Sequence, residues 1–312
     1  MIDILMATFN GEKYIEEQIN SILKQTYSDW HLYIQDDAST DKTCEIIEKI
    51  VSANPEKITF IKKTVGSGSA KENFLSMLKY VKSDYFMFSD QDDFWLNNKI
   101  ENTHSAMIAA EYKYGKNCPI AVHTDLYVTD EKLNIKTNSW LKKSMFFKRN
   151  KTLLNSMLDS PLAGCTTELN KAVLSVVLTD NLDEIYVHDW WISLCVLNFG
   201  HIVTLYNPTI LYRQHSNNSV GVRNEPVAVS ALKTVFLSKQ HKHRKDIVKS
   251  KINTLKNFYY IYYESIDADT KIAMKKLFES ESKIKLKKIY TVIKYHIGAP
   301  SLVSLLYYFA FC

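Results

Sequence analysis

The sequence predicts an α/β protein with a mostly parallel sheet that is covered by helices on both faces. In the first hundred residues of this 312-residue chain, apolar runs of strand length alternate with segments whose apolar residues recur at helical spacing. This alternation is typical of β-α units. Acidic residues directly follow two of the strands, and right-handed crossovers bring such strand ends to one edge of the sheet. We therefore expect a ligand site along that edge.

The elements follow one another from the first residue. Predicted strands cover residues 2–7, 30–34, 58–61, 85–88 and 120–124. Predicted helices cover residues 14–23, 44–51, 73–81, 97–112, 153–158, 169–178 and 190–199, and residues 126–135 look antiparallel. The loop Gly66-Ser67-Gly68 matches neither a P-loop nor a GxGxxG motif, which disfavours ordinary NTPase and dinucleotide-binding functions.

The strongest chemical signal is a group of three carboxylates within four positions. Asp90, Asp92 and Asp93 follow the apolar run Tyr85–Phe88. Crowded carboxylates repel one another and raise their own pKa values unless a cation neutralises them. Oxygen ligands suit Mg²⁺ or Mn²⁺, and Mg²⁺ is usually shared between carboxylates and substrate phosphates. The alternative is an acidic N-cap, supplied by Asp92 or Asp93, for the helix that starts near Leu96.

Two later motifs also carry polar groups suited to chemistry. Asp189 lies in the first turn of an apolar helix, where the helix dipole favours its ionised form, although an N-cap is the simpler interpretation. His215 follows a short strand and precedes turn residues, and a single histidine is more often structural than a ligand. The small residues 160–167 allow either close approach of a ligand or a plain turn.

Composition places the chain among ordinary globular proteins. Hydrophobic residues make up 46% and charged residues 23% of the sequence. The five cysteines are scattered without metal-ligand spacing, and no secretory signal opens the chain. We expect reduced thiols, no structural zinc and a cytoplasmic location.

Charge divides the chain in two. Residues 231–296 hold 16 Lys and Arg against 6 Asp and Glu, a balance of +10 in a chain whose net charge is +5. We predict an N-terminal domain over residues 1–225 and a basic helical extension over residues 226–312. The apolar end, residues 301–311, is too short to span a bilayer. A basic segment with an apolar, aromatic end fits an anionic membrane surface better than nucleic acid, and the alternative is a helical bundle packed on the N-terminal domain.

With these motifs described, residues 1–222 resemble the family-2 glycosyltransferases of the GT-A fold. The resemblance rests on the stretches Met6–Asn10, Gln35–Asp41, Ser89–Asp93, His188–Trp190 and Tyr212–His215. The sequences of residues 71–74, 90–95 and 212–218 resemble those of bacterial rhamnosyltransferases of polysaccharide assembly. Ala38 departs from the family, which commonly has Gly there, and we expect Ala to be tolerated unless its φ is positive.

The resemblance implies a role for each motif. It implies an inverting transfer of a sugar to a saccharide acceptor, with L-rhamnose from dTDP-rhamnose as the best match. The basic segment with its apolar end suggests that this acceptor is lipid-linked and that the enzyme works at the inner face of the cell membrane. Of Trp190 and Trp191, we expect one to pack against a sugar ring and the other to lie in the core. The residues that would hold the nucleotide base are Ala7, Thr8, Phe9, Asn10 and Asp37, with Glu12 nearby. Asp90 would face the ribose or a metal-bound water, and Asp92 and His215 would bind Mg²⁺ or Mn²⁺. Asp189 would act as the catalytic base.

Two other classes of function remain open at this point. A metal-dependent nucleotidyltransferase or phosphohydrolase would use the carboxylates, but it leaves Asp189 and residues 212–218 without a role. A non-catalytic carbohydrate-binding protein would not need the intact set of acids. A nucleotide-sugar hydrolysis assay separates the three functions.

Overall fold

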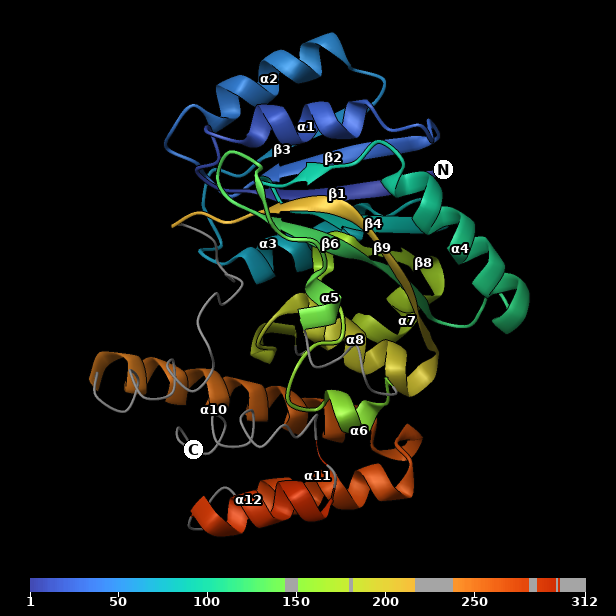
Figure 1. The fold of residues 1–312 in the computed structure, drawn as a ribbon, viewed down its shortest axis with the longest axis vertical. Coiled ribbons are helices and arrows are strands. Elements are labelled where there is room, and N and C mark those ends of the chain that lie inside the picture. The colour runs from blue at the N-terminus through green and yellow to red at the C-terminus, as the bar shows by residue number, and fades with distance from the viewer. Residues whose placement is uncertain (144–150, 180–181, 217–237, 281–284, 296, 298–312) are drawn as a thin grey trace. The chain divides into compact units, whose positions relative to one another are not determined.

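The computed structural model describes residues 1–143, 151–179, 182–216, 238–280, 285–295 and 297. Its contacts divide the chain into two compact units (Figure 1). Unit 1 comprises residues 1–143, 162–178 and 200–221, and unit 2 comprises residues 144–161, 179–199 and 222–312. The predicted domain boundary near residue 225 stays a prediction.

Unit 1 is built around one sheet, which confirms the predicted α/β class. The strands are β1 (Ile2–Thr8), β2 (Trp30–Asp36), β3 (Ile58–Lys62), β4 (Tyr85–Ser89), β5 (Phe94–Trp95), β6 (Ile120–Thr129), β7 (Ile135–Thr137), β8 (Thr167–Asn170) and β9 (His201–Arg213). Their order is β3-β2-β1-β4-β8-β6-β9-β5, with β7 beside β6. The half from β3 to β4 is parallel as expected. The other half is mixed, because β8 runs antiparallel to both of its neighbours and β9 runs parallel to β6.

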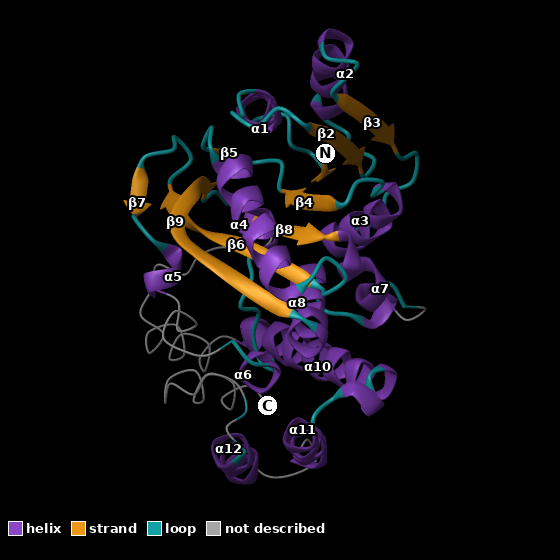
Figure 2. Cartoon of the chain, turned by 90° about the vertical axis from the view of Figure 1, so that its right-hand side faces the viewer, coloured by secondary structure: helices purple, strands orange, loops and turns teal. Residues whose placement is uncertain are grey.

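Helices cover both faces of this sheet. Unit 1 contains α1 (Ile15–Leu23), α2 (Thr43–Ala53), α3 (Ala70–Met77), α4 (Lys99–Tyr114), α5 (Trp140–Lys143) and α7 (Leu174–Val177). Gln35 of β2 bonds to Asn73 and Ser76 at α3, whereas the next residue, Asp36, contacts Cys44 of α2. Neighbouring residues of a strand point to opposite faces, so α2 and α3 cover different faces (Figure 1). Figure 2 shows α4 lying across β6 and β8.

Strands β1, β2 and β4 lie in the core because their sequences are largely apolar on both faces, whereas the edge strand β3 is partly exposed. Only Ala7 among the residues of β1 is half-buried, and every residue of β4 is buried. Continuous apolar runs of this kind are typical of parallel strands covered on both sides. The predicted strands near residues 2, 30, 58 and 85 are therefore confirmed, and each ends at the same edge of the sheet.

The prediction of a helix over residues 169–178 is wrong in its first part. Leu169 and Asn170 belong to β8, where Leu169 pairs with Phe86 of β4 and with Ala121 of β6. A helix, α7, forms only after them. A four-residue strand gives almost no periodicity of its own, and pairing with two longer strands decides its conformation.

Unit 2 is helical, which confirms the predicted helical character of the C-terminal extension. It contains α6 (Leu153–Ser156), α8 (His188–Phe199), α10 (Ser238–Ile261), α11 (Ala268–Ser280) and α12 (Lys285–Lys294). Trp190 and Trp191 are both buried: Trp190 donates its indole N–H to the Ser156 carbonyl at 2.8 Å, and Trp191 packs on Phe258. The expectation that one of them is a sugar platform is wrong, because α8 is apolar around most of its circumference.

Among the described residues, no helix is long and apolar enough to cross a membrane. The predicted apolar end, residues 301–311, lies outside the described part of the chain. The four cysteines that the structure describes, Cys44, Cys118, Cys165 and Cys195, are free thiols.

Candidate active site

The loops that follow β1 and β4 are joined at the edge of the sheet. The Gln91 side-chain amide donates to the Phe9 carbonyl at 2.9 Å, and the Phe9 N–H donates to Gln91 Oε1 at 2.9 Å. An added Cβ at Gly11 would lie 2.3 Å from Gln91 Oε1, so a larger residue at this position would displace the Gln91 side chain. The expected convergence of strand-end loops is thus confirmed for these two strands.

The loops that follow β1 and β2 are also joined. Asn10 donates its N–H to Ser39 Oγ at 2.8 Å and accepts from the Thr40 N–H at 2.9 Å. Glu12 accepts from the Lys42 N–H at 3.0 Å. Of the predicted base-binding residues, Ala7 is half-buried, Thr8 is buried, and the Phe9 ring is exposed at the rim. The two loops are therefore held together along one edge of the sheet.

The two acids at the end of β2 are surrounded by donors. Asp36 accepts from Thr8 and Ser39 hydroxyls at 2.9 and 2.6 Å and from the Ser39 N–H at 2.8 Å. Asp37 accepts from Lys63 at 3.0 Å and from the Ser67 and Gly68 N–H groups at 2.9 and 3.1 Å. Burial of Asp37 acts to raise its pKa, but the hydrogen bonds from Ser67 and Lys63 outweigh it and lower the pKa.

Ala38, directly after these acids, has a φ of +66°. A left-handed conformation costs an L-residue with a Cβ roughly 1–2 kcal/mol. The condition under which we expected Ala to be tolerated is therefore not met, and the turn is strained. Hydrogen bonds to Asp36 and Asp37 on either side of Ala38 keep the turn in this conformation.

The predicted metal ligands Asp92 and His215 lie together, although 123 positions separate them in the sequence. Asp92 Oδ2 and His215 Nε2 are 2.8 Å apart, and the side chains are 16% and 9% exposed. The His215 ring stacks on Tyr14, with ring centres 4.9 Å apart. Both side chains are thus held at the edge of the sheet while keeping some access to solvent.

A second group of possible ligand atoms lies deeper. Ligand atoms of Asp90, Asp93 and Cys165 lie within 4.8 Å of one another. Asp93 is fully buried, and its Oδ2 has no hydrogen-bond partner among the described residues. Burial raises the pKa of Asp93 well above its ordinary value, and the neighbouring charges of Asp92 and Asp90 raise it further. The buried amine of Lys99 stands over the Trp95 ring, 4.2 Å from its centre.

Asp92 and His215, with the acids around them, fit a divalent ion. Two donor atoms 2.8 Å apart match neighbouring ligands of an octahedral ion with bonds of about 2.0–2.1 Å. A carboxylate and an imidazole together suit Mn²⁺, whereas the Cys165 thiol is a soft donor that suits neither Mg²⁺ nor Mn²⁺. The crowding of three carboxylates, one of them with an unpaired buried oxygen, also favours a cation.

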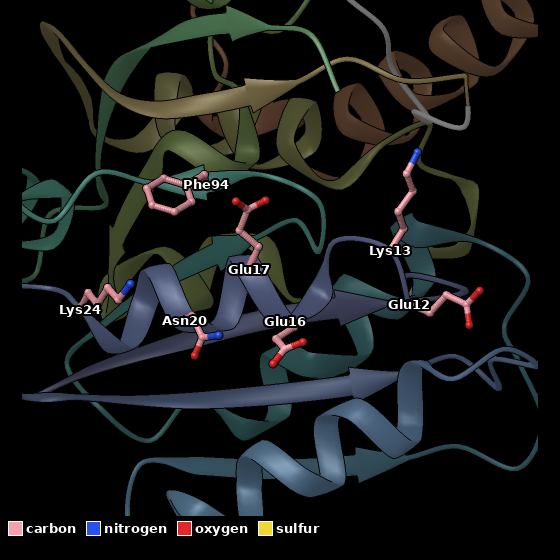
Figure 3. Close-up of a pocket in the computed structure, with 7 residues that line it drawn as sticks. All are labelled: Glu12, Lys13, Glu16, Glu17, Asn20, Lys24 and Phe94. Atoms are coloured by element: carbon pink, nitrogen blue, oxygen red, sulfur yellow. The ribbon is translucent and has the colours of Figure 1, made fainter. Parts of the chain in front are cut away.

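A surface hollow of about 390 Å³ lies along α1 (Figure 3). Its lining residues are Glu12, Lys13, Glu16, Glu17, Asn20, Lys24 and Phe94. Of the predicted site residues only Glu12 lines it, so we do not assign the donor to this hollow.

Asp189 lies in unit 2, in the first turn of α8, and is half-buried. Burial lowers the pKa of its neighbour His188 to about 4, so that imidazole is neutral at physiological pH. The catalytic role of Asp189 stays a prediction.

Several residues at this edge were missed in the sequence. Gln91, Arg213 and Cys165 lie within stretches that we singled out, but no role was assigned to them. Arg213 donates from Nε to the Asp92 carbonyl at 2.8 Å. A buried arginine beside an acidic cluster has no local sequence signature, because its partners come from other elements.

The sequence matches the family model described as Glycosyl transferase family 2 over residues 3–161. The chain belongs to glycosyltransferase family 2. It is 31% identical over 257 residues to the dTDP-rhamnosyl transferase RfbG of Shigella flexneri, covering 78% of this chain and 82% of the relative. It is 28% identical over 204 residues to the UDP-Glc:alpha-D-GlcNAc-diphosphoundecaprenol beta-1,3-glucosyltransferase WfgD of Escherichia coli, covering 65% and 72%.

Solved structures agree on the fold of this family-2 enzyme. TarS of S. aureus in complex with UDP matches with a TM-score of 0.56 at 18% identity, over 99% of this chain and 86% of that one. The mannosyltransferase PcManGT from Pyrobaculum calidifontis, in complex with GDP-Man and Mn²⁺, matches with a TM-score of 0.52 at 12% identity, over 99% and 85%. The protein is a GT-A glycosyltransferase, so the other two functional classes are set aside.

Proposed function

We propose that this glycosyltransferase moves L-rhamnose from dTDP-rhamnose to a lipid-linked saccharide acceptor, with inversion at the anomeric carbon and with Mg²⁺ or Mn²⁺ bound. The observation that carries the proposal is the 2.8 Å approach of Asp92 and His215 beside the joined strand-end loops. The choice of donor is supported by the name and the 31% identity of the Shigella flexneri relative. A lipid-linked acceptor is supported by the name of the Escherichia coli relative.

Each group of residues has one task in this proposal. Asp92 and His215 hold the divalent ion. When bound, the ion supplies positive charge that stabilises the leaving diphosphate. Ala7, Thr8, Phe9, Asn10 and Asp37 with Glu12 hold the base, and Asp90 faces the ribose.

Asp189 takes the proton of the acceptor hydroxyl in the proposed reaction. The acceptor oxygen then bonds to the anomeric carbon while the bond from that carbon to the diphosphate breaks. Because attack comes from the face opposite the diphosphate, the anomeric configuration inverts. The first turn of α8 favours the ionised form of this carboxylate before the reaction.

We also propose that the enzyme works on an anionic membrane surface, on the cytoplasmic side. Large apolar side chains of α10, α11 and α12, among them Tyr260, Ile272 and Tyr290, are exposed. Exposed Lys249, Lys275 and Lys294 lie on the same three helices. Each lysine near an anionic surface contributes about 1 kcal/mol, which predicts reversible, salt-sensitive attachment.

Vesicle flotation tests this attachment. The full chain should float with vesicles rich in phosphatidylglycerol at low salt, and it should stay behind with neutral phosphatidylcholine vesicles. Equal behaviour with the two vesicle types would remove the membrane from the proposal.

The enzymatic proposal is tested with a panel of dTDP-, UDP- and GDP-sugars, with Mn²⁺, Mg²⁺ or chelator. We expect transfer or slow hydrolysis of dTDP-rhamnose only with metal. Asp189→Asn is nearly isosteric, so nucleotide binding should persist while turnover decreases by roughly 10²–10⁴-fold, the usual contribution of a general base. Unchanged turnover would remove Asp189 from the mechanism.

A further inference from the structure

Arg213, the last residue of β9, is buried beside the proposed metal ligands, with only 3% of its side chain exposed. A buried guanidinium must have partners for its N–H groups, since burial without them costs several kcal/mol. Its partners come from three different parts of unit 1. Nε donates to the Asp92 carbonyl, Nη1 donates to the Glu131 carbonyl, and Nη2 donates to the Glu17 carboxylate.

Arg213 and His215 hold the same residue at two points. The Arg213 side chain bonds to the main-chain oxygen of Asp92, and the His215 ring bonds to the carboxylate of Asp92. Residues two apart in an extended chain point to the same face. The N–H of Gln214 donates to Thr129 at 3.1 Å and continues the pairing of β9 with β6. Arg213 and His215 are therefore presented together from one extended segment.

Tyr14 fixes the two side chains relative to one another. Its ring lies 4.6 Å from the Arg213 guanidinium carbon and 4.9 Å from the centre of the His215 ring. Tyr14 directly precedes α1, and Glu17 lies in the first turn of the same helix. One helix thus supplies both an aromatic surface and a charged acceptor to the end of β9.

We propose that Arg213, Tyr14 and Glu17 form a clamp that positions Asp92 and His215 for the divalent ion. Arg213 is a positioning residue, because it acts on the ligand Asp92 through the main chain. Its main-chain N–H also approaches Asp93 Oδ1, at 3.3 Å, and so fixes the neighbouring acid. The inference rests on the proposed metal dependence and extends it to residues that would not contact the ion.

The clamp requires the planar fork of arginine. Lysine carries the same charge as a single compact ammonium and cannot reach three acceptors that lie in different directions. Partners that orient metal ligands typically contribute 10- to 100-fold to metal affinity. We therefore expect Arg213→Lys to raise the Mn²⁺ concentration needed for half-saturation by roughly 10–100-fold.

Glu17 offers a milder test, because its side chain is 48% exposed and its replacement does not open the core. Glu17→Gln keeps the shape and removes the charge that meets Arg213. Figure 3 shows Glu17 pointing from α1 toward the strand that carries Phe94, whereas Glu16 points away from it. Glu16→Gln is thus a matched control on the same helix turn.

The experiment measures binding instead of turnover. Unfolding temperatures of the full chain and of the three variants are recorded against Mn²⁺ concentration at a fixed concentration of dTDP, since a bound ligand raises the unfolding temperature by mass action. The expected result is a Mn²⁺-dependent rise for all proteins, with half-saturation at roughly tenfold or more higher Mn²⁺ for Arg213→Lys and Glu17→Gln and unchanged for Glu16→Gln.

The outcomes separate the clamp from the proposed function. Equal half-saturation for the wild type and Glu17→Gln would overturn the clamp and leave the metal-dependent function standing. No Mn²⁺-dependent rise in the wild type, with dTDP or with UDP and GDP in its place, would overturn both. If Arg213→Lys fails to fold, the half-saturating Mn²⁺ concentrations of Glu17→Gln and Glu16→Gln still test the clamp.

Discussion

The acids after β2 and the acids after β4 both follow strands that pair with β1, yet their surroundings are opposite. Asp36 and Asp37 accept hydrogen bonds from hydroxyl, amide and ammonium groups of the adjoining loops. Asp93 is buried with one oxygen unpaired among the described residues, and Asp92 meets the His215 ring. The first pair of acids therefore organises the loops, and the second group has negative charge left for a cation.

An acidic strand end is therefore not a metal site by itself. The number of donors around each carboxylate separates the two roles, and that number depends on side chains from other elements. Replacing acids in the two loops should accordingly affect different properties of the enzyme.

The largest effect is expected for Asp92→Ala. Loss of a ligand should remove metal-dependent stabilisation of the leaving group, which is worth several kcal/mol and corresponds to roughly a 10³-fold decrease in transfer rate. Unfolding free energy should change little, because the relief of repulsion on Asp90 and Asp93 offsets the loss of the contact with His215. Sugar-transfer assays and urea unfolding of the same preparation measure both. A normal Mn²⁺ response in this variant would contradict the assignment of Asp92.

Lys99→Met tests the burial of an amine next to the second group of acids. Burial lowers the pKa of Lys99 to about 8 from 10.5. Between these values the unfolded chain binds a proton that the folded protein lacks, so the stability of the wild type rises as pH rises from about 8 to about 10.5. Below pH 8 the free-energy cost of burying the protonated Lys99 amine has its full value, at most about 3 kcal/mol. Lys99→Met should therefore be more stable than the wild type by up to that amount.

Unfolding of wild type and Lys99→Met at pH 7, 8, 9 and 10 measures this gap, which should narrow with rising pH. Lys113→Met, at an exposed position of the same helix, should differ from wild type by an amount that does not change with pH. If the difference in unfolding free energy between Lys99→Met and the wild type also stays constant with pH, the Lys99 amine is not the cause of that difference.

Asp36→Ala is the counterpart of Asp92→Ala at the end of β2. It removes the acceptor of the buried Thr8 hydroxyl and of the half-buried Ser39, which should lower the unfolding free energy by about 2 kcal/mol. Urea unfolding measures the loss. Half-saturation by Mn²⁺ should change less than in Asp92→Ala. The comparison of the two loops breaks if Asp36→Ala keeps full stability and loses its Mn²⁺ response.

The sequence predicted the strands of the parallel half well, because each is a continuous apolar run that ends in polar residues. It also indicated Asp92 and His215 together, from a family resemblance over segments 123 positions apart. The clamp of Arg213 could not be predicted, because Tyr14 and Glu17 reach it only through the packing of α1 against the ends of β5 and β9. The place of β8 between β4 and β6 depends on pairing that four residues do not encode locally.

The sequence predicted that Ala38 is tolerated unless its φ is positive, and the structure shows that it is positive. Its φ of +66° means that Ala38→Gly should raise the unfolding free energy by about 1 kcal/mol, as relief of strain exceeds the added entropy of the unfolded chain. Thermal or urea unfolding measures the gain. Ala121→Gly, in the regular strand β6, should instead lower stability, and an equal loss at both positions would mean that Ala38 is unstrained in solution.

The divalent ion is proposed to bind at Asp92 and His215, which follow β4 and β9. Anomalous diffraction from crystals grown with Mn²⁺ and dTDP tests it most directly. We predict one strong anomalous peak within about 2.2 Å of Asp92 Oδ2 and His215 Nε2. A peak beside Asp36 and Asp37, a peak between Asp93 and Cys165 with none at His215, or dTDP bound without any peak would contradict it.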